Sequence, residues 1–265
     1  MNSLTMTPAY NAIPKFLQQQ SYKNPTDQAP FNLAYQTDLP VFKWREHNPE
    51  NAKVGQAFMA AQRIGQRSVW DNQVPMQDFQ LSREDIVNDR VLVCDVGGGS
   101  GHQCLDLRKH HPSLTGRIVT EDLGTMQELS TIRDELAKQN ITMQPHDFFQ
   151  EQPIKGAKVY YLRNVIHNWN DEPSKVILSQ IAKAMSPDLV VIVDDVIMPL
   201  AAMERTKDHF SQLLSDSGLQ LRDVWTYDSD YGDSFIVAVP NDSTSSAEAN
   251  GHATNGDATN GHSVA

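Results

Sequence analysis

One stretch, Arg90–Gln103 (RVLVCDVGGGSGHQ), restricts the fold of this chain more than any other. It begins with a run rich in valine, Val91–Val96, which is apolar except for Asp95 and predicts a buried strand. Glycine then fills four of the five positions in Gly97–Gly101, and a helical pattern starts at His102. In an open α/β sheet, a strand, a glycine turn and a helix in this order bring backbone N–H groups and a helix N-terminus against a ligand. The sequence therefore predicts a ligand site at this turn.

The spacing of the glycines narrows the class of ligand. A dinucleotide fingerprint counted from Gly97 would need a small residue where His102 stands, and the G-K-[ST] of a nucleoside-triphosphate loop is missing. The turn instead reads acid-x-G-x-G-x-G, beginning with Asp95. An acid at the end of a strand suits a ligand that carries an ammonium group, and S-adenosylmethionine (SAM) is such a ligand. A glycine-rich turn that binds no ligand is the alternative.

From residue 89 onward, strand and helix patterns alternate, which predicts a mainly parallel sheet covered by helices on both faces. The last two strands, joined by the turn 228–233, are expected to form an antiparallel hairpin at one edge. This α/β arrangement is similar to the Rossmann-like domain of class I methyltransferases. The expected strands are 90–96, 117–121, 141–145, 157–163, 189–195, 219–226 and 235–239. The expected helices are 102–110, 125–139, 172–185 and 207–215.

The chain divides into three parts. Residues 1–85 show no strand pattern, and helices are expected near 10–20, 32–37 and 49–66. Residues 86–240 are expected to form the SAM-dependent methyltransferase domain. Residues 241–265, in which ATNG occurs twice, contain too few apolar side chains to bury a core and are expected to be disordered.

Composition disfavours several classes of protein. The 33 acidic residues outnumber the 22 Lys and Arg residues, and the net charge of −11 argues against a nucleic acid partner. No apolar run approaches the roughly 20 residues of a membrane span, and the first residues lack the features of a secretory signal. Cys94 and Cys104 are expected to be packed thiols in a reducing compartment, in preference to a disulfide or a metal pair. We therefore expect a soluble, cytoplasmic protein.

Polar side chains follow the expected strands at their carboxyl ends, where open sheets bind ligands. Asp122 lies about 20 residues after the glycine turn, where a carboxylate can hold both hydroxyls of a ribose. Asp147 and Phe148 follow the third strand and offer an acceptor for the adenine amine and a ring for the adenine face. The next two strand ends bring Arg163, His167 and Asp195.

Several blocks of the sequence, taken together, resemble the plant- and fungal-type small-molecule O-methyltransferases. In the order of that family they are DVGGGSGHQ, TEDL, HDFF, YYLRNVIHNWND, DDVIMP and MERTKDHFSQLL, and the similarity covers roughly residues 25–240. The resemblance implies methyl transfer from SAM to a hydroxyl of a phenolic or polyketide-type metabolite, without a metal. It also implies which residues bind the cofactor: Gly97 and Gly98 the methionine part, Asp122 the ribose, Asp147 and Phe148 the adenine, with Arg163 a further contact.

By the same resemblance, His167 matches the general base of the family, and Asp195 and Glu204 match the two acids that orient the base or the substrate. The chemistry agrees with these roles. A phenol is a poor nucleophile until its proton is removed, and a neutral imidazole can remove it near neutral pH. A neighbouring carboxylate fixes the tautomer of the imidazole. A structural histidine near the start of a helix is the alternative for His167.

The sequence departs from the family pattern in three places. The family has a winged-helix dimerisation domain before the helices expected here. It also has a longer segment before the MERT motif, where this chain has only residues 200–202. The third departure is Asn168, which replaces the aspartate of a His-Asp-Trp motif. Apolar faces on the N-terminal helices are compatible with burial against the core, with a homodimer or with a partner subunit.

Two functions therefore stay open. The first is a SAM-dependent O-methyltransferase with an aromatic or polyketide acceptor. The second is a methyltransferase-like protein that binds the cofactor or a partner and no longer methylates, acting as a scaffold or catalysing a cyclisation. An NAD-dependent oxidoreductase is disfavoured by His102 at the sixth position of the glycine turn.

Overall fold

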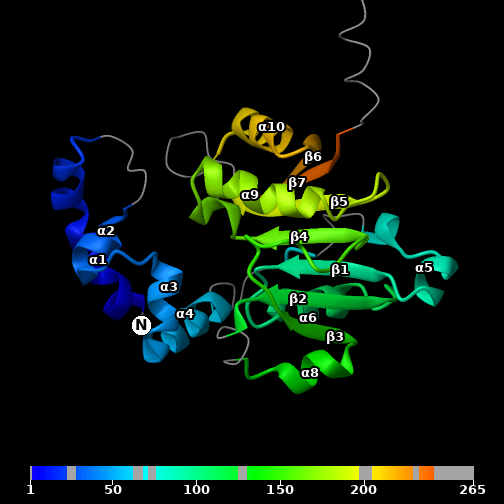
Figure 1. Ribbon diagram of the computed structural model, residues 1–265. Coiled ribbons are helices and arrows are strands. Elements are labelled where there is room, and N and C mark those ends of the chain that lie inside the picture. Colours follow the sequence, from blue (N-terminus) through cyan, green and yellow to red (C-terminus); the bar gives the residue numbers. More distant parts are fainter. Residues whose placement is uncertain are drawn as a thin grey trace, which may run out of the picture.

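The structure is a computed structural model that describes residues 2–22, 28–61, 68–70, 76–124, 130–196, 205–228 and 233–241. Its centre is a seven-stranded sheet in the order β3-β2-β1-β4-β5-β7-β6 (Figure 1). Neighbouring strands from β3 to β5 pair in parallel, and β7 pairs antiparallel with both β5 and β6. The predicted fold class, a parallel sheet that ends in an antiparallel hairpin, is confirmed. The strands are β1 Val91–Val96, β2 Arg117–Asp122, β3 Ile141–Pro145, β4 Val159–Arg163, β5 Val190–Val196, β6 Leu219–Asp228 and β7 Asp233–Pro240.

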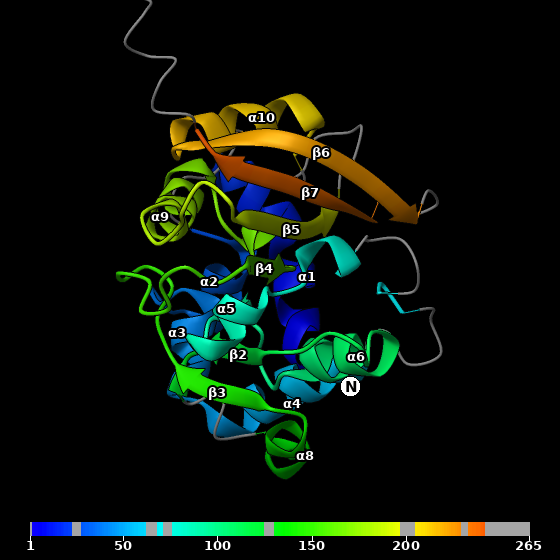
Figure 2. The same ribbon diagram turned by 90° about the vertical axis from the view of Figure 1, so that its right-hand side faces the viewer.

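Helices cover the two faces of this sheet. Helices α9 and α10 bury apolar side chains against one face, and α6 buries Cys104 and Leu107 against the other. Figure 2 shows α9 and α6 on opposite sides of the strands. The helices along the chain are α1 Asn2–Gln19, α2 Pro30–Tyr35, α3 Val41–Glu46, α4 Pro49–Ala61, α5 Arg83–Val87, α6 His102–His110, α8 Arg133–Lys138, α9 Asp171–Ala182 and α10 Lys207–Asp216, with 3-10 turns η1 Met76–Phe79 and η2 Ile166–Asn168.

Burial explains why β1 reads as a continuous apolar run. All six of its residues are buried because it lies inside the sheet, between β2 and β4, with helices on both faces. In the outer strand β3, only Ile141 is fully buried, and the other residues are half-buried or exposed. Both cysteines, Cys94 on β1 and Cys104 on α6, are free and buried, as the sequence predicted for packed thiols.

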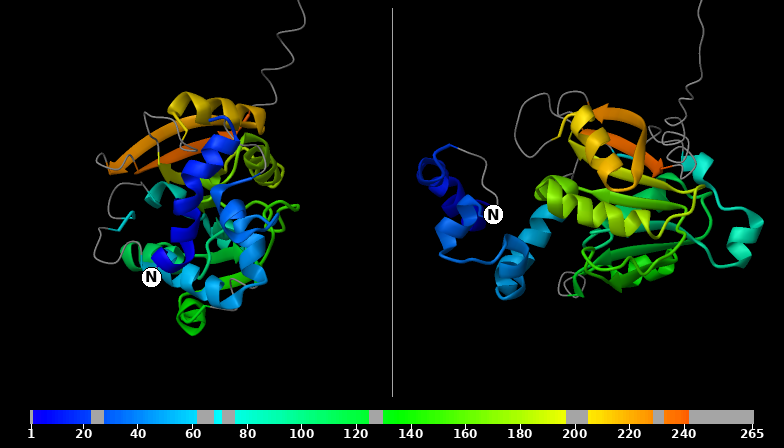
Figure 3. Two further views of the ribbon diagram at one scale, coloured as in Figure 1. Left: turned by 90° about the vertical axis from the view of Figure 1, so that its left-hand side faces the viewer. Right: turned by 45° about the horizontal axis from the view of Figure 1, so that its top comes forward.

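Helices α1–α4 lie beyond one end of the sheet, and α5 lies beyond the opposite end (Figures 1 and 3). Because α5 directly precedes β1, the amino ends of the parallel strands are on the side of α5. The carboxyl ends therefore face the N-terminal helices. One contact across this side joins Phe42 of α3 to Trp169, with ring centroids 6.2 Å apart. Among the described helices, none combines the length and the apolar character needed to cross a bilayer.

The N-terminal helices differ in detail from the expectation. Helix α3 was not expected, and α1 begins earlier than predicted and contains both Pro8 and Pro14. The expected helix 49–66 begins at residue 49, and residues 62–66 lie outside the described part. The low-complexity tail also lies outside it, apart from Asn241.

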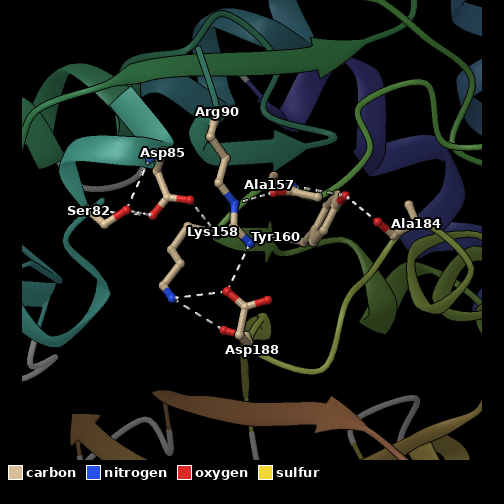
Figure 4. Close-up of polar contacts among 9 residues, drawn as sticks. Ser82, Asp85, Arg90, Ala157, Lys158, Tyr160, Ala184 and Asp188 are labelled. Carbon is tan, nitrogen blue, oxygen red and sulfur yellow. Dashed lines mark hydrogen bonds and ion pairs between the residues drawn. The ribbon is translucent and has the colours of Figure 1, made fainter. Parts of the chain in front are cut away.

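A charged network closes the amino end of the sheet (Figure 4). The guanidinium of Arg90 donates to Asp85 (2.8 Å), to Asp188 (3.0 Å) and to the backbone oxygen of Gly156 (2.7 Å). Hydrogen bonds from Arg90 and Ser82 lower the pKa of Asp85 to about 2. A pocket of about 620 Å³ opens beside these residues, and Arg90, which lines it, is ion-paired with Asp85 and Asp188. The network therefore joins α5, β1 and the loops that precede β4 and β5.

Candidate functional site

The glycine turn after β1 docks onto the end of β2. The N–H groups of Gly97 and Gly98 donate to the backbone oxygen of Glu121 at 2.8 and 2.9 Å. A Cβ at Gly98 would fall within van der Waals contact of Asp95 and Thr120, only 2.5 Å from Asp95 Cγ. Gly97 has φ +75°, and a Cβ there would meet Val165 at 2.8 Å. Close approach of neighbouring side chains thus requires glycine at both positions.

The structure brings Asp122 to this turn, as the sequence predicted. One oxygen of its carboxylate accepts from the N–H of Gly99 (2.8 Å) and the other from the N–H of Leu123 (2.7 Å). Burial raises the pKa of Asp122, while the two N–H donors act in the opposite direction. The preceding acid, Glu121, points to the other face of the sheet, where it accepts from Gln152 at 2.8 Å. Alternation along β2 therefore leaves Asp122 as the acid of the turn.

Asp95 occupies a different place from the one expected. Its side chain is 1% exposed and lies behind Gly98, whereas the sequence predicted an acid that faces a ligand. One oxygen accepts from the thiol of Cys104 at 3.2 Å, and the other has no hydrogen-bond partner among the described residues. Burial raises the pKa of Asp95 to about 7. Asp95 therefore supports the turn from inside the sheet.

The loop after β3 places Asp147 and Phe148 beside the glycine turn, at the edge of the sheet formed by the carboxyl ends of the parallel strands. The carboxylate of Asp147 accepts from the N–H of Phe149 at 3.1 Å and so holds the loop in shape. A Cβ at Gly97 would lie 3.6 Å from the Phe148 ring, so this ring stands directly beside the glycine turn. Its centroid is 6.0 Å from that of Trp169. The loops that follow β1, β3 and β4 therefore meet at Phe148.

Arg163, at the end of β4, belongs to a buried polar cluster. Its Nη1 donates to Asp194 at 2.9 Å and to Gln103 of α6 at 3.2 Å. The hydroxyls of Tyr161 and Tyr227 donate to the same carboxylate of Asp194. Burial opposes the charge of Arg163, but Tyr161 and Asp194 outweigh burial and raise the pKa of the guanidinium. The sequence identified Arg163 but gave no sign of the two tyrosines, which come from β4 and β6.

His167 and Asp195 form a close pair of base and acid at the carboxyl end of the parallel strands. The Nδ1 atom of His167 lies 2.8 Å from Asp195 Oδ1, and the backbone N–H of His167 donates to Asp195 Oδ2 at 2.9 Å. Asp195 is 1% exposed at its side chain, whereas the imidazole is 29% exposed. A carboxylate only accepts, so the neutral imidazole carries its proton on Nδ1 and its lone pair on Nε2. Such a histidine can accept a proton at Nε2.

Two neighbouring residues, Glu204 and Arg205, precede α10. Glu204, predicted as a second acid, lies outside the described residues. Arg205, the next residue, was not singled out by the sequence, yet its side chain is 7% exposed and hydrogen-bonded to the turn that carries His167. The chain part that the structure describes contains no group of three or more His, Cys, Asp or Glu side chains arranged to hold a metal ion.

The edge therefore has two halves. One half is the glycine turn that follows β1, flanked by Asp122 and Phe148, which suits a ligand with a ribose and a flat ring. The other half is the His167–Asp195 pair, which suits the removal of a proton from a second molecule. The two halves meet at Phe148 and Trp169.

The chain is similar in sequence to known O-methyltransferases. A family profile described as an O-methyltransferase domain matches residues 19–215. The methyltransferase cfoC of Aspergillus candidus is 33% identical over 244 residues, covering 84% of this chain and 59% of that protein. The demethylsterigmatocystin 6-O-methyltransferase stcP of Emericella nidulans is 32% identical over 211 residues, covering 73% of this chain and 98% of that protein. Of two further Aspergillus relatives the chain spans 63% and 60%.

Solved structures agree with this similarity. LepI in complex with SAM superposes with a TM-score of 0.77 at 25% identity, covering 89% of this chain and 64% of LepI. OxaC in complex with SAH and oxaline superposes with a TM-score of 0.75 at 25% identity, covering 91% of this chain and 64% of OxaC.

Proposed function

Because this chain belongs to the O-methyltransferase family, we propose that it transfers a methyl group from SAM to a hydroxyl of a phenolic or polyketide-type metabolite. The observation that carries the proposal is the contact between His167 Nδ1 and Asp195 Oδ1 at the same sheet edge as the glycine turn. Residues 86–240 would form the methyltransferase domain, preceded by the helical segment 1–85. Relatives named as O-methyltransferases, and neighbours solved with SAM or SAH, support the choice of cofactor.

The residues of the turn fit the cofactor. Gly97 and Gly98 would lie against its methionine part, by their match to the glycine motif of the family, and the space beside them that a Cβ would need is taken by protein side chains. Asp122 would hold the ribose hydroxyls, and Asp147 and Phe148 would receive the adenine. We keep Arg163 as a further contact to the cofactor by its match to the family motif, and its ion pair with Asp194 (2.9 Å) holds the guanidinium in place. When bound, SAM supplies an electrophilic methyl group on a sulfonium.

His167 would act as the general base. With Nδ1 held by Asp195, Nε2 takes the proton of the acceptor hydroxyl as the oxygen becomes nucleophilic. Asp195 stabilises the imidazolium that results, and it keeps the ring in one orientation through its second contact to the backbone N–H of His167. General base catalysis of this kind contributes typically about 10²–10⁴-fold to the rate. We keep Glu204 as a second orienting acid by its match to the family motif.

An aromatic acceptor suits the neighbourhood of this base. Trp169 follows His167 by two residues and packs edge-to-face with Phe149, with centroids 4.8 Å apart. Phe42 of α3 reaches Trp169 from the N-terminal helices, and Arg45 lies 5.9 Å over the Phe42 ring. Flat, apolar rings of this kind favour a planar aromatic ligand. The relatives named for demethylsterigmatocystin, and the OxaC structure with oxaline, support a ring-containing metabolite.

A second candidate is a protein that binds the cofactor without methylating. Asn168 favours it, because its amide donates to the backbone of Asn164 at 2.6 Å and carries no charge. The match of stcP over 98% of its length favours methyl transfer, because a relative of that extent is named as a methyltransferase.

One experiment separates the two candidates. The protein is incubated with methyl-labelled SAM and a panel of phenols and aromatic polyketides, and the His167→Gln variant, of similar volume, is treated in the same way. We expect labelled product from the parent protein and a loss of about 10²–10⁴-fold in the variant. Calorimetry measures SAM binding by both proteins. Tight binding with no labelled product from any acceptor would favour the second candidate, and turnover retained by His167→Gln would refute the base assignment.

Contacts to a second copy would fall on α1. Tyr10, Ile13 and Leu17 recur on one face of this helix and are 58%, 36% and 37% exposed. We assign to this face the homodimer or partner contact that its apolar side chains suggest. Light scattering is expected to give twice the monomer mass, and a monomer at high protein concentration would contradict the homodimer.

A further inference from the structure

Arg205 is one of the few charged residues that are buried in the described part of the chain, at 6% exposure. It stands just before α10, whose N-cap is Thr206. Its guanidinium donates to the carboxylate of Asp171 from both Nε (2.9 Å) and Nη2 (2.8 Å), and to the hydroxyl of Ser174 at 3.2 Å. These contacts to the start of α9 pair the buried charge, as a buried arginine requires.

The guanidinium of Arg205 also reaches the backbone of a neighbouring turn. Nη1 donates to the oxygen of Ile166 at 3.1 Å, and Nη2 donates to the oxygen of Trp169 at 2.8 Å. These two oxygens flank His167 on either side, since η2 runs from Ile166 to Asn168. One planar guanidinium therefore holds both ends of the turn that carries the imidazole.

Asp195 holds the same turn from the direction of β5, through the backbone N–H and Nδ1 of His167. The turn itself is only three residues long and has two internal backbone bonds, each 3.1 Å, from Asn168 to Val165 and from Trp169 to Ile166. So short a turn has little stiffness of its own. Its position is set by the two buried groups that grip it.

We propose that Arg205 is a positioning residue for His167. Resting on the proposed function, the inference is that Arg205 fixes the imidazole in the orientation in which Nε2 can take a proton from the acceptor. The guanidinium fork matches two carbonyls at once, which an ammonium group does not. A displacement of about 1 Å at a catalytic group can lower the rate by about 10²-fold. Arg205 also links the packing of α10 to the base.

The test compares two conservative substitutions. Arg205→Lys keeps the charge near Asp171 but loses the simultaneous contact to both carbonyls. Arg90→Lys is the matched control, because Arg90 also joins carboxylates to a backbone oxygen, at the opposite end of the sheet (Figure 4). We expect Arg205→Lys to lower kcat by about 10–100-fold with the KM for the acceptor and the Kd for SAM within about twofold. Arg90→Lys is expected to lower the melting temperature and leave kcat unchanged.

A second readout does not depend on turnover. Nitrogen-15 NMR of labelled histidine reports the tautomer of His167, assigned with the His167→Gln variant, and the pH at which the ring titrates. The parent protein is expected to show the Nδ1-protonated form, and Arg205→Lys a mixture of forms with a shifted titration. Unchanged spectra together with unchanged kcat in Arg205→Lys would overturn the inference. So would a loss of kcat that merely follows the melting temperature in both lysine variants. If the parent transfers no methyl group, shifted spectra in Arg205→Lys still support the positioning role while the proposed function fails.

Discussion

Gly98 is the position where a single added methyl group should do most damage to the glycine turn. In Gly98→Ala, the new Cβ would lie 2.5 Å from Asp95 Cγ and would also overlap the oxygens of Asp95 and Thr120. Ordinary contact between carbon atoms begins at about 3.5–4.0 Å, so the overlap is at least about 1 Å. Asp95 and Thr120 are 1% and 0% exposed, so neither side chain can move into solvent. The turn must shift instead.

The expected loss of stability follows from this overlap. Overpacking a rigid site typically destabilises a protein by about 1–3 kcal/mol. In a chain of this size, a loss of about 2 kcal/mol lowers the melting temperature by roughly 4–8 °C. The shift also moves the backbone that would face the cofactor, so we expect the affinity for SAM to fall at least about tenfold.

Thermal melts and calorimetric titration with SAM measure the two effects. Gly156→Ala is the control, because Gly156 also sits in a loop, with φ +68°, but a Cβ there would meet nothing within 4 Å. It is expected to lose stability, by about 1–2 kcal/mol for the left-handed backbone, and to keep its affinity for SAM. In the double variant of Gly98→Ala with Asp95→Ala, the overlap with Asp95 is gone, so the two costs should not add. Additivity to within about 0.5 kcal/mol, or unchanged SAM affinity in Gly98→Ala, would refute the reasoning.

Three further predictions follow from the buried acids. Asp195→Asn should lower kcat by about 10²–10⁴-fold in the assay with labelled methyl groups, because an amide offers an N–H where His167 needs an acceptor. Asp194→Asn is the comparison, and its main effect should be a lower stability. Equal kcat in Asp195→Asn and the parent would contradict the role of Asp195. Asp122→Asn should weaken SAM binding by about tenfold or more in calorimetry, and it should also lower the melting temperature, because the amide removes one of the two oxygens that accept from Gly99 and Leu123. Unaltered affinity would remove Asp122 from the site. Because burial raises the pKa of Asp95 to about 7 from near 4 in the unfolded chain, the folded state binds the extra proton between these values, so the stability contribution present at low pH is lost as pH rises towards 7. Urea unfolding at pH 5 and pH 8 should therefore show a smaller decline for Asp95→Asn than for the parent, and parallel declines would count against it.

Much of the sheet could be predicted from the sequence, because its signals are local. Runs of valine, isoleucine and leucine marked the buried strands, and the alternation with helices indicated parallel pairing. The same local signal could not predict to which face of the sheet the Asp95 side chain points. Every residue of β1 is buried, so the apolar run shows no alternation from which the face of one side chain can be read.

The missed parts of the site depend on contacts between distant segments. Arg205 meets Ile166 across 39 positions, and Tyr161 and Tyr227 reach Asp194 from two other strands. No spacing or periodicity marks such contacts. Helix α3 was missed for a different reason. It is only six residues long and starts after Pro40, which has no side-chain oxygen to cap a helix.

The two acids near the carboxyl end of β5 have a consequence for which mutations such a protein can tolerate. Asp194 and Asp195 are neighbours in the chain, yet successive residues of a strand point to opposite faces, so one anchors Arg163 and the other anchors His167. The half of the edge assigned to the cofactor and the half assigned to the base thus share a strand but no carboxylate. Mutations can rebuild or silence the base while the carboxylate network around Arg163 keeps the sheet intact. Loss of the base therefore leaves the contacts between Asp194 and Arg163 in place.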